Sequence, residues 1–359
     1  MASPFARIGA CECARTRAAG TTCAHRAETT AMEPSTNSHI AGAGRIIDAR
    51  TVAPPASPED AVLAIGNFDG VHRGHQSLVA RARREADARG LPCVIVTFDP
   101  HPRQVLRPDA PFGLVATVEE RAAWLLQAGA HRVIVWPFDD QTRTQSPREF
   151  LAAIGRHARP RAVVHGPGFA LGRARAGTAD VLGAIGREDG FDLVPIEPLG
   201  TAGDRVSSSA IREAIERGDV EAAARGLGRW PTYSGIVVPG NRVGRTIGFP
   251  TANLEPSVPR VVPADGVYAA WVERWPFTHC ERRFLGAVSV GDRPTFAGTL
   301  RLVEAFLLDF DDDLYGETLR LHLVARIRGQ ERFASVDDLV TQMHHDVALC
   351  RGVLSTNPV

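Results

Sequence analysis

The spacing of apolar residues changes near residue 230, and this change constrains the fold more than any other feature of the sequence. Before it, short apolar runs alternate with amphipathic stretches of helical spacing, which is the pattern of buried parallel strands joined by helices. After it, Gly and Pro separate short apolar runs, as in a small antiparallel barrel. We therefore expect an α/β domain built on a parallel sheet, followed by an all-β domain.

The same patterns place the individual elements. In the first part we expect strands over 61–65, 94–98, 133–136 and 162–164, and helices over 77–88, 119–128, 147–156, 208–216 and 220–227. In the second part we expect strands over 233–238, 266–272, 286–290, 301–310 and 318–327, followed by a helix over 336–349. Ligands of the parallel sheet should lie at the carboxyl ends of its strands.

Three segments follow from this organisation. We expect a flexible N-terminal extension over 1–46, a nucleotide-binding domain over 47–225 and a barrel domain over 230–355. The extension contains Cys11, Cys13, Cys23 and His25, whose spacing matches no structural zinc pattern, so we expect solvated side chains there and no metal. Translation could also start at Met32, which remains an open alternative.

The composition excludes several classes of function. Acidic and basic residues balance at 41 each without a long single-sign run, so we expect no nucleic-acid or membrane partner. All 41 basic residues are Arg, which excludes a lysine-dependent phosphate loop and a lysine nucleophile. The six Cys do not form a disulfide framework, and no run approaches the ~18 apolar residues of a membrane span. We expect a cytoplasmic protein that acts on small molecules.

The first predicted strand leads directly into GNFDGVHRGH at residues 66–75, where a doubly wound sheet binds nucleotides. His72 and His75 are three residues apart, so in a first helical turn both can donate to one phosphate. Gly74 lets a phosphate or base approach the backbone, and the helix N-terminus adds amide donors. The alternative is an ordinary strand-to-helix turn with two surface histidines.

A second motif, VSSSAIR at residues 206–212, can complete this pocket. Ser207 and Ser208 can cap a helix while they contact phosphate, and Arg212 can neutralise a β- or γ-phosphate one turn later. The combination of the two motifs resembles the nucleotidylyltransferase superfamily, whose members transfer a nucleotide monophosphate to an acceptor phosphate and release pyrophosphate.

The longer run AIGNFDGVHRGH at 64–75, together with TFDPHP at 97–102, is similar to one branch of that superfamily. This branch is the adenylyltransferase module of bacterial bifunctional riboflavin kinase/FAD synthetases, which adenylylates FMN to FAD. The resemblance implies a Rossmann-like fold with catalytic His72 and His75. It also implies an ATP-phosphate site at Gly66, Asp69, Gly74, Ser207, Ser208 and Arg212, and flavin contacts from Phe98 and Phe169.

One loop departs from this branch. Its members typically carry Gly-x-Asp/Asn-Phe-x-Phe-Gly, whereas residues 166–172 read GPGFALG, with Gly168 in place of the polar residue. Losing a polar group that fixes a ligand costs about 1–3 kcal/mol. We therefore expect this loop to weaken the adenylyl transfer without abolishing the fold.

In the second part, GNRVGRTIGFPTAN at residues 240–253 concentrates glycines at a strand end. Gly240, Gly244 and Gly248 let successive amides face an anion. In an extended chain Thr251 and Asn253 share one face, where their oxygens are the hard ligands that Mg²⁺ prefers. The alternative is a Gly-rich hairpin with Thr and Asn as turn formers.

This string resembles the riboflavin kinase signature, and with its supporting segments the resemblance covers about residues 61–349. It implies that Arg245 and the glycines bind ATP, that Arg328 contacts flavin and that Glu304 is the catalytic base. Without the resemblance, a strand Glu is more often a solvated face residue. The family often has His where Phe306 stands and Thr where Asp292 stands.

Together the resemblances imply a bifunctional enzyme with ATP, riboflavin and FMN as its small-molecule partners and Mg²⁺ as its cofactor. The small antiparallel barrel with its C-terminal helix would phosphorylate riboflavin to FMN, and the parallel sheet would convert FMN to FAD. One alternative is a riboflavin kinase whose N-terminal domain is weakly active or regulatory. Another is a nucleotidylyltransferase for a different phosphate acceptor. The sequence does not indicate the oligomeric state.

Overall fold

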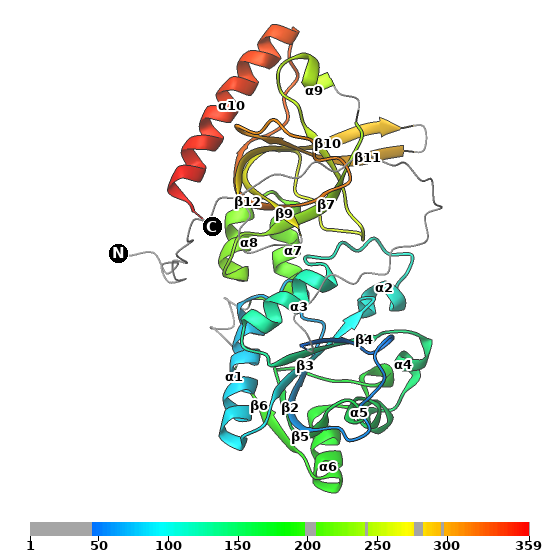
Figure 1. The fold of residues 1–359 in the computed structure, drawn as a ribbon. Coiled ribbons are helices and arrows are strands. Elements are labelled where there is room, and N and C mark those ends of the chain that lie inside the picture. The colour runs from blue at the N-terminus through cyan, green and yellow to red at the C-terminus, as the bar shows by residue number, and fades with distance from the viewer. Residues whose placement is uncertain (1–44, 198–205, 241–242, 276–282, 296–297, 359) are drawn as a thin grey trace, which may run out of the picture. The chain divides into compact units, whose positions relative to one another are not determined.

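The N-terminal part of the fold is a six-stranded parallel sheet in the order β1-β4-β3-β2-β5-β6 (Figure 1). It is seen in a computed structural model, which describes residues 45–197, 206–240, 243–275, 283–295 and 298–358. The strands are β1 Ile46–Asp48, β2 Asp60–Ile65, β3 Cys93–Asp99, β4 Arg132–Pro137, β5 Arg159–His165 and β6 Asp192–Pro195. The helices of this part are α1 Arg73–Arg89, α2 Pro102–Leu106, α3 Val118–Gln127, α4 Asp140–Thr144, α5 Pro147–Gly155 and α6 Ala179–Asp189.

Both faces of this sheet are buried, because successive side chains of a strand point to opposite sides. Val62 and Ala64 of β2 belong to a core shared with α1 and α3, whereas Leu63 and Ile65 belong to a second core shared with α5 and α6. Capping boxes at Thr117 and Ser146 begin α3 and α5. The apolar runs of the sequence are therefore continuous because each strand is covered twice.

The strand order reverses at β2, which pairs with β3 on one side and with β5 on the other. Ligands of open α/β sheets bind at such a switch point, outside the carboxyl ends of the strands. The loops that follow β2 and β5 span residues 66–72 and 166–172, so the topology brings both predicted loops to the same edge.

The C-terminal part is a closed barrel in the order β10-β11-β8-β7-β12-β9, in which all pairs are antiparallel. The strands are β7 Thr232–Val238, β8 Ala252–Glu255, β9 Gly266–Trp275, β10 Phe284–Thr295, β11 Gly298–Leu307 and β12 Thr318–Arg328. The short helix α9 Val243–Thr246 lies within the glycine-rich segment. Helix α10 Val336–Thr356 lies along the outside of the barrel (Figure 1), where Cys350 and Leu354 pack on Ala269 and Val324.

The described residues of the sheet and of the barrel belong to one compact unit. Helices α7 Ser208–Glu216 and α8 Val220–Leu227 share a small core with Val115 and Val261. Beside this core, Leu114 forms a parallel bridge with Arg260. A Cβ atom on Gly113 would stand 2.5 Å from the Val261 nitrogen, so only glycine permits this close approach.

The predicted architecture of a parallel sheet, an antiparallel barrel and a C-terminal helix is confirmed. Strands β1 and β6 lie at the sheet edges and were not predicted, because three and four residues are too few for a periodicity signal. Helices α2 and α4, with five residues each, were not predicted either. The extension was predicted over residues 1–46, but Ile46 begins β1 and pairs with Val133. For residues 1–44 the predicted flexibility and absence of metal lie outside the described part of the chain.

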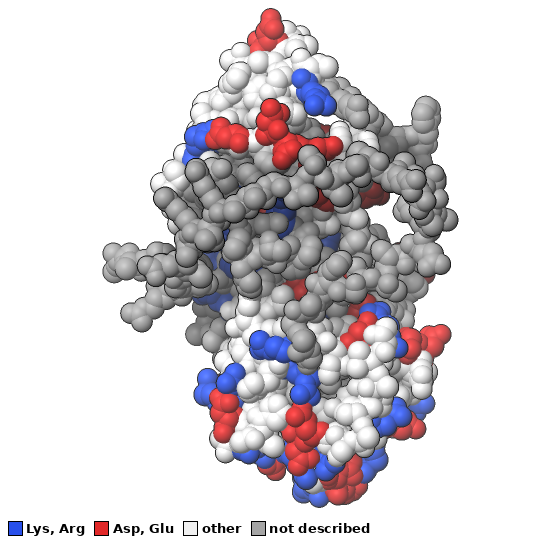
Figure 2. Space-filling model, viewed as in Figure 1, with Lys and Arg blue, Asp and Glu red and all other residues white. Residues whose placement is uncertain are grey.

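Charged side chains are mixed on the visible surface. On the face shown in Figure 2, positive and negative groups of the described residues are interspersed over the parallel-sheet part. Ion pairs join some of the exposed charges in this part, for example Arg89 and Asp192 at 2.8 Å. The described part of this face therefore does not present the single-sign stripe that is typical of nucleic-acid binding.

Candidate active sites

The loop after β2 has an unusual backbone that side chains from elsewhere hold in place. Phe68, Gly70 and Val71 have positive φ angles of 51°, 77° and 39°, which are costly for the two non-glycine residues. The Asn67 carbonyl accepts hydrogen bonds from Thr97 Oγ1 at 3.1 Å and Arg121 Nη1 at 2.7 Å. The Asp69 carbonyl accepts one from Ser208 Oγ at 2.8 Å. Distant elements thus hold a strained loop at the switch point.

His72 and His75 lie together at the start of α1. His72 is the N-cap residue, and the two imidazole rings stack with centroids 3.6 Å apart. Burial lowers the pKa of His72 to about 4, although the charge of Asp69 opposes the shift. Burial, the charge of His72 and the charge of Arg121 hold the pKa of His75 well below its usual value. Both rings are therefore neutral at pH 7.

The hydrogen bonding of His72 determines its tautomer. The His75 backbone amide donates to His72 Nδ1 at 3.3 Å, so the neutral ring carries its proton on Nε2. This N–H group can donate to a phosphate oxygen without bringing a positive charge into the buried site.

Asp69 and Arg212 form a buried ion pair with an Nη2 to Oδ2 distance of 2.8 Å. The Asp69 carboxylate also accepts from the Val115 and Ala116 amides at 3.0 and 3.1 Å. Arg212 Nε also donates to the Gly113 carbonyl at 2.9 Å. Arg212 is thus held by Asp69, and a phosphate would meet an already oriented guanidinium.

Ser207 and Ser208 both have structural roles in the described fold. Ser207 caps α7, because its Oγ accepts from the Ala210 amide at 3.2 Å. Ser208 instead bonds the loop at Asp69. Ser207 and Ser208 line the same cavity as the histidine pair.

This cavity has a volume of about 1170 Å³ and lies at the carboxyl edge of the sheet. It brings together every predicted site residue of the N-terminal part. These residues are Gly66, Asp69, His72, Gly74, His75, Phe98, Phe169, Ser207, Ser208 and Arg212. Residues from four separate stretches of sequence therefore converge on one space that is large enough for a nucleotide and a flat aromatic ligand.

The loop 166–172 forms one wall of the cavity. Gly168 has a φ of +67°, and a Cβ atom placed there would meet nothing within 4 Å. Its carbonyl accepts a hydrogen bond from Arg175 Nη2 at 2.7 Å. The wall therefore carries an arginine that the sequence analysis did not assign, beside the position where the polar side chain is missing.

A cluster of aromatic and basic residues on the cavity wall was not predicted from the sequence. The guanidinium carbons of Arg103 and Arg212 lie 4.7 and 4.4 Å from the centroid of the Phe112 ring. His101 lies 4.8 Å from the same ring, and burial lowers its pKa to about 4. The motif TFDPHP contained His101, but the segment around Phe112 has no pattern that marks it.

A second candidate site lies on the outside of the barrel. Asn253 of β8 and Glu304 of β11 are directly opposite each other in the antiparallel ladder. Such pairs have Cβ atoms about 4.5–5.5 Å apart. Ala252 and Leu254 enter the barrel core, so Thr251 and Asn253 face outward on the same side. The predicted metal ligands and the predicted base are thus neighbours.

The glycine-rich segment folds over this face. A Cβ atom on Gly240 would lie 2.2 Å from Asn253 Nδ2, and one on Gly244 would lie 2.2 Å from the Phe249 carbonyl oxygen. Phe249 is buried and packs edge-on against Phe306 and His344, with ring centroids 5.3 and 4.9 Å away. Two predicted phosphate-binding residues, Arg245 and Gly248, are exposed in this segment.

The donors on this face suit a hard cation, because Thr251, Asn253 and Glu304 offer hydroxyl, amide and carboxylate oxygens. Among the described residues, no group of three or more His, Cys, Asp or Glu side chains could hold a metal ion.

The structure places Arg328, the predicted flavin contact, against α10. Its guanidinium forms a bidentate ion pair with Asp346, with Nε to Oδ1 and Nη2 to Oδ2 distances of 2.9 and 2.7 Å. The hydrogen bonds with Asp346 raise the pKa of Arg328. In this structure Arg328 ties α10 to the barrel.

The fold and the two sites define a two-domain protein with a nucleotide-type cleft in a parallel sheet and an oxygen-rich face on a barrel. The FAD synthetase family model matches residues 54–210, and the riboflavin kinase family model matches residues 227–354. The chain belongs to the bifunctional riboflavin kinase/FMN adenylyltransferase family.

Relatives match along most of their length. The bifunctional riboflavin kinase/FMN adenylyltransferase of Escherichia coli K12 is 35% identical over 82% of this chain and 93% of its own. The enzyme of that name from Bacillus subtilis is 33% identical over 79% of this chain and 90% of its own.

A solved structure also matches. It is described as a macrolide-efflux protein from Streptococcus pneumoniae and is 32% identical, with a TM-score of 0.74 over 85% of this chain and 98% of its own.

The described residues of the present chain include no helix that is long and apolar enough to cross a membrane.

Proposed function

We propose that the barrel transfers the γ-phosphoryl group of ATP to the primary alcohol of riboflavin, which yields FMN and ADP. The parallel-sheet part then transfers the adenylyl group of a second ATP to the FMN phosphate, which yields FAD and pyrophosphate. The observation that carries this proposal is the convergence of the predicted residues at two separate places, the cavity and the β8–β11 face.

In the kinase reaction the proton of the attacking hydroxyl goes to the Glu304 carboxylate as the new O–P bond forms. Thr251 and Asn253 are the residues that would hold Mg²⁺, which when bound supplies positive charge to the phosphates. The glycine-rich segment contributes backbone amides, and its fold over Asn253 would exclude water from the transfer.

In the adenylyl transfer an oxygen of the FMN phosphate attacks the α-phosphorus of ATP, and the bond to pyrophosphate breaks. No proton needs to move, so the site must orient phosphates and accommodate their charge. His72 Nε2–H and Arg212 are the donors that the geometry supports, with the N-terminus of α1 adding amides and its dipole.

We also propose a cytoplasmic location. The thiols of Cys93 and Cys350 are free and buried. Free thiols persist in a reducing compartment, which supports this location.

The direct test is to incubate the purified protein with riboflavin, ATP and MgCl₂ and to resolve the flavins by chromatography. We expect FMN to appear first, followed by FAD with an equal amount of pyrophosphate. Chelation of Mg²⁺ with EDTA should stop FMN formation, and added MgCl₂ should restore it. FMN without FAD would eliminate the adenylyl transfer, and the absence of both products would eliminate the kinase reaction as well.

The Gly168→Asn variant should bind FMN more tightly in the adenylyl transfer. Asn tolerates the φ of +67° at this position, and its Cβ atom has free space. One added hydrogen bond of about 0.5–1.5 kcal/mol lowers the KM for FMN roughly 2- to 10-fold. The measurement is the KM for FMN in FAD formation. Gly168→Ala is the matched control, since it adds the Cβ atom without the amide, and equal KM values for the two variants would contradict the prediction.

A further inference from the structure

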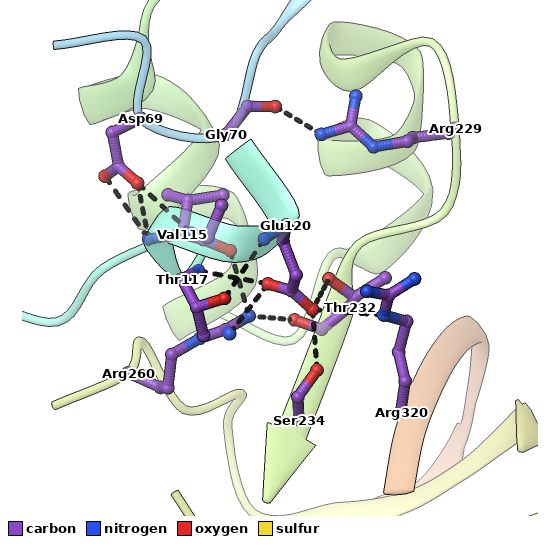
Figure 3. Close-up of polar contacts among 11 residues, drawn as sticks. Asp69, Gly70, Val115, Thr117, Glu120, Arg229, Thr232, Ser234, Arg260 and Arg320 are labelled. Carbon is purple, nitrogen blue, oxygen red and sulfur yellow. Dashed lines mark hydrogen bonds and ion pairs between the residues drawn. The ribbon is translucent and has the colours of Figure 1, made fainter. Parts of the chain in front are cut away.

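Arg229 lies between the two parts of the chain, directly after Gly228, the C-cap of α8, and before β7. It is outside the segment 54–210 that the FAD synthetase family model matches. Nevertheless its guanidinium reaches the loop of the cavity in the parallel-sheet part. Nη2 donates to the Gly70 carbonyl, the contact drawn in Figure 3, and Nη1 donates to the Val71 carbonyl at 3.2 Å.

The environment of Arg229 is unusual for a cation. Its guanidinium carbon lies 3.5 Å from the centroid of the Trp124 ring. Burial lowers the pKa of Arg229 to about 9, so it remains charged at neutral pH. In the described part of the chain no carboxylate forms an ion pair with it, and its polar partners are the carbonyls of Gly70, Val71 and Leu227. By exposure Arg229 is only partly buried, and the charge of Glu120 opposes the effect of desolvation on its pKa. A cation that donates to three carbonyls and to no carboxylate still needs a specific reason.

The loop supplies such a reason. Val71 is a β-branched residue with a φ of +39°, a conformation that persists only where its surroundings determine it. Its carbonyl accepts from Gln76 Nε2 at 2.8 Å in addition to Arg229. The next residue is His72, which caps α1 and stacks on His75. A change at the Gly70 and Val71 carbonyls is therefore one residue away from the histidine pair.

We propose that Arg229 is a positioning residue for adenylyl transfer, which holds the Gly70–Val71 backbone and through it the His72–His75 pair. This inference rests on the proposed adenylyl transfer at the cavity. If Arg229 has this role, a residue at the junction with the barrel supports the adenylylation site. Arg229 itself does not line the cavity.

The charge of Arg229 offers a readout that a purely structural role would not move. The charges of Asp69 and Arg229 shift the pKa of His72. The pKa of His75 is shifted by the charges of Arg121, Arg229 and His72. The positive charge of Arg229 lowers the pKa of both imidazoles, in addition to the larger effect of burial. Its removal should raise both pKa values and move the acid limb of the pH profile of FAD formation to higher pH.

The test compares Arg229→Met, Arg229→Lys and wild type in two assays, FAD formation from FMN and FMN formation from riboflavin. We expect Arg229→Met to lower kcat for FAD formation at least 10-fold, to shift its acid limb upward and to leave riboflavin phosphorylation within 2-fold. Arg229→Lys keeps the charge but loses the planar fork, so kcat should fall while the acid limb stays in place. Arg225→Met, an exposed arginine of α8, is the matched control and should leave both activities unchanged.

Each outcome has a definite meaning. A wild-type protein that makes no FAD would overturn the proposed adenylyl transfer itself. Wild-type FAD formation together with an unchanged kcat in Arg229→Met would overturn the positioning role. If Arg229→Met does not fold and therefore also loses kinase activity, the Arg229→Lys variant provides the test. Reduced FAD formation with normal riboflavin phosphorylation would support the inference. A wild-type kcat for FAD formation in Arg229→Lys would overturn it.

Discussion

The Glu304→Gln variant should phosphorylate riboflavin about 10²- to 10⁴-fold more slowly than wild type, the usual contribution of a positioned general base. The amide has nearly the same shape as the carboxylate, so the β8–β11 ladder around Asn253 should be preserved. The amide, however, cannot accept the proton of the attacking hydroxyl. The measurement is the initial rate of FMN formation at saturating ATP and riboflavin.

The same variant should convert supplied FMN to FAD at the wild-type rate, because the cavity of the parallel-sheet part lies on other elements. His75→Ala should show the reverse pattern, losing FAD formation and keeping phosphorylation. Glu255→Gln, an exposed glutamate on the neighbouring strand β8, serves as the matched control. Wild-type FMN formation by Glu304→Gln would remove Glu304 from the proposed mechanism.

The second large effect concerns stability, and it arises at Glu120. This carboxylate is only 1% exposed and joins the two parts of the chain (Figure 3). It accepts from Ser234 Oγ at 2.6 Å, Arg260 Nη1 at 2.8 Å and Arg320 Nε at 3.2 Å. Glu120→Ala leaves two buried guanidinium groups without their carboxylate, which should lower the free energy of unfolding by about 3–5 kcal/mol.

Urea denaturation followed by fluorescence measures this loss. Glu119→Ala, on the preceding residue of the same helix, is the control and should change stability by less than about 1 kcal/mol. The double variant Glu120→Gln/Arg260→Met removes one negative and one positive charge and should recover part of the loss. If Glu120→Ala is as stable as Glu119→Ala, the buried cluster does not stabilise the junction.

The pH dependence of stability follows from the same group. Burial alone would raise the pKa of Glu120, but the charges of Arg260 and Arg320 outweigh it and bring the pKa to about 2. Because this value lies below the ordinary 4.5, the contribution of Glu120 is complete above 4.5 and is lost as the pH falls toward 2. The stability difference between wild type and Glu120→Gln should therefore shrink over that range.

Local patterns in the sequence were sufficient for the fold class and for the motifs. A buried parallel strand, a loop and a capped helix are contiguous in residues 60–89, so their spacing alone indicated where His72 and His75 would lie. The same holds for Thr251 and Asn253, because alternation along an extended chain places them on one face. The positions that we propose for phosphate and metal binding could be located in the sequence because each motif is short.

Only the tertiary structure decided how these motifs are held. Ser234, Arg260 and Arg320 lie 114, 140 and 200 residues from Glu120, and Arg229 lies 159 residues from Gly70. No periodicity or spacing links such positions, since their contacts depend on how the sheet, α7, α8 and the barrel pack together. From the sequence alone, Glu120 is predicted to cap a helix and Arg229 to lie in a linker. Because partners from the other half of the chain pack against them, Glu120 lies at the centre of an ion cluster and Arg229 supports the loop that carries the two histidines.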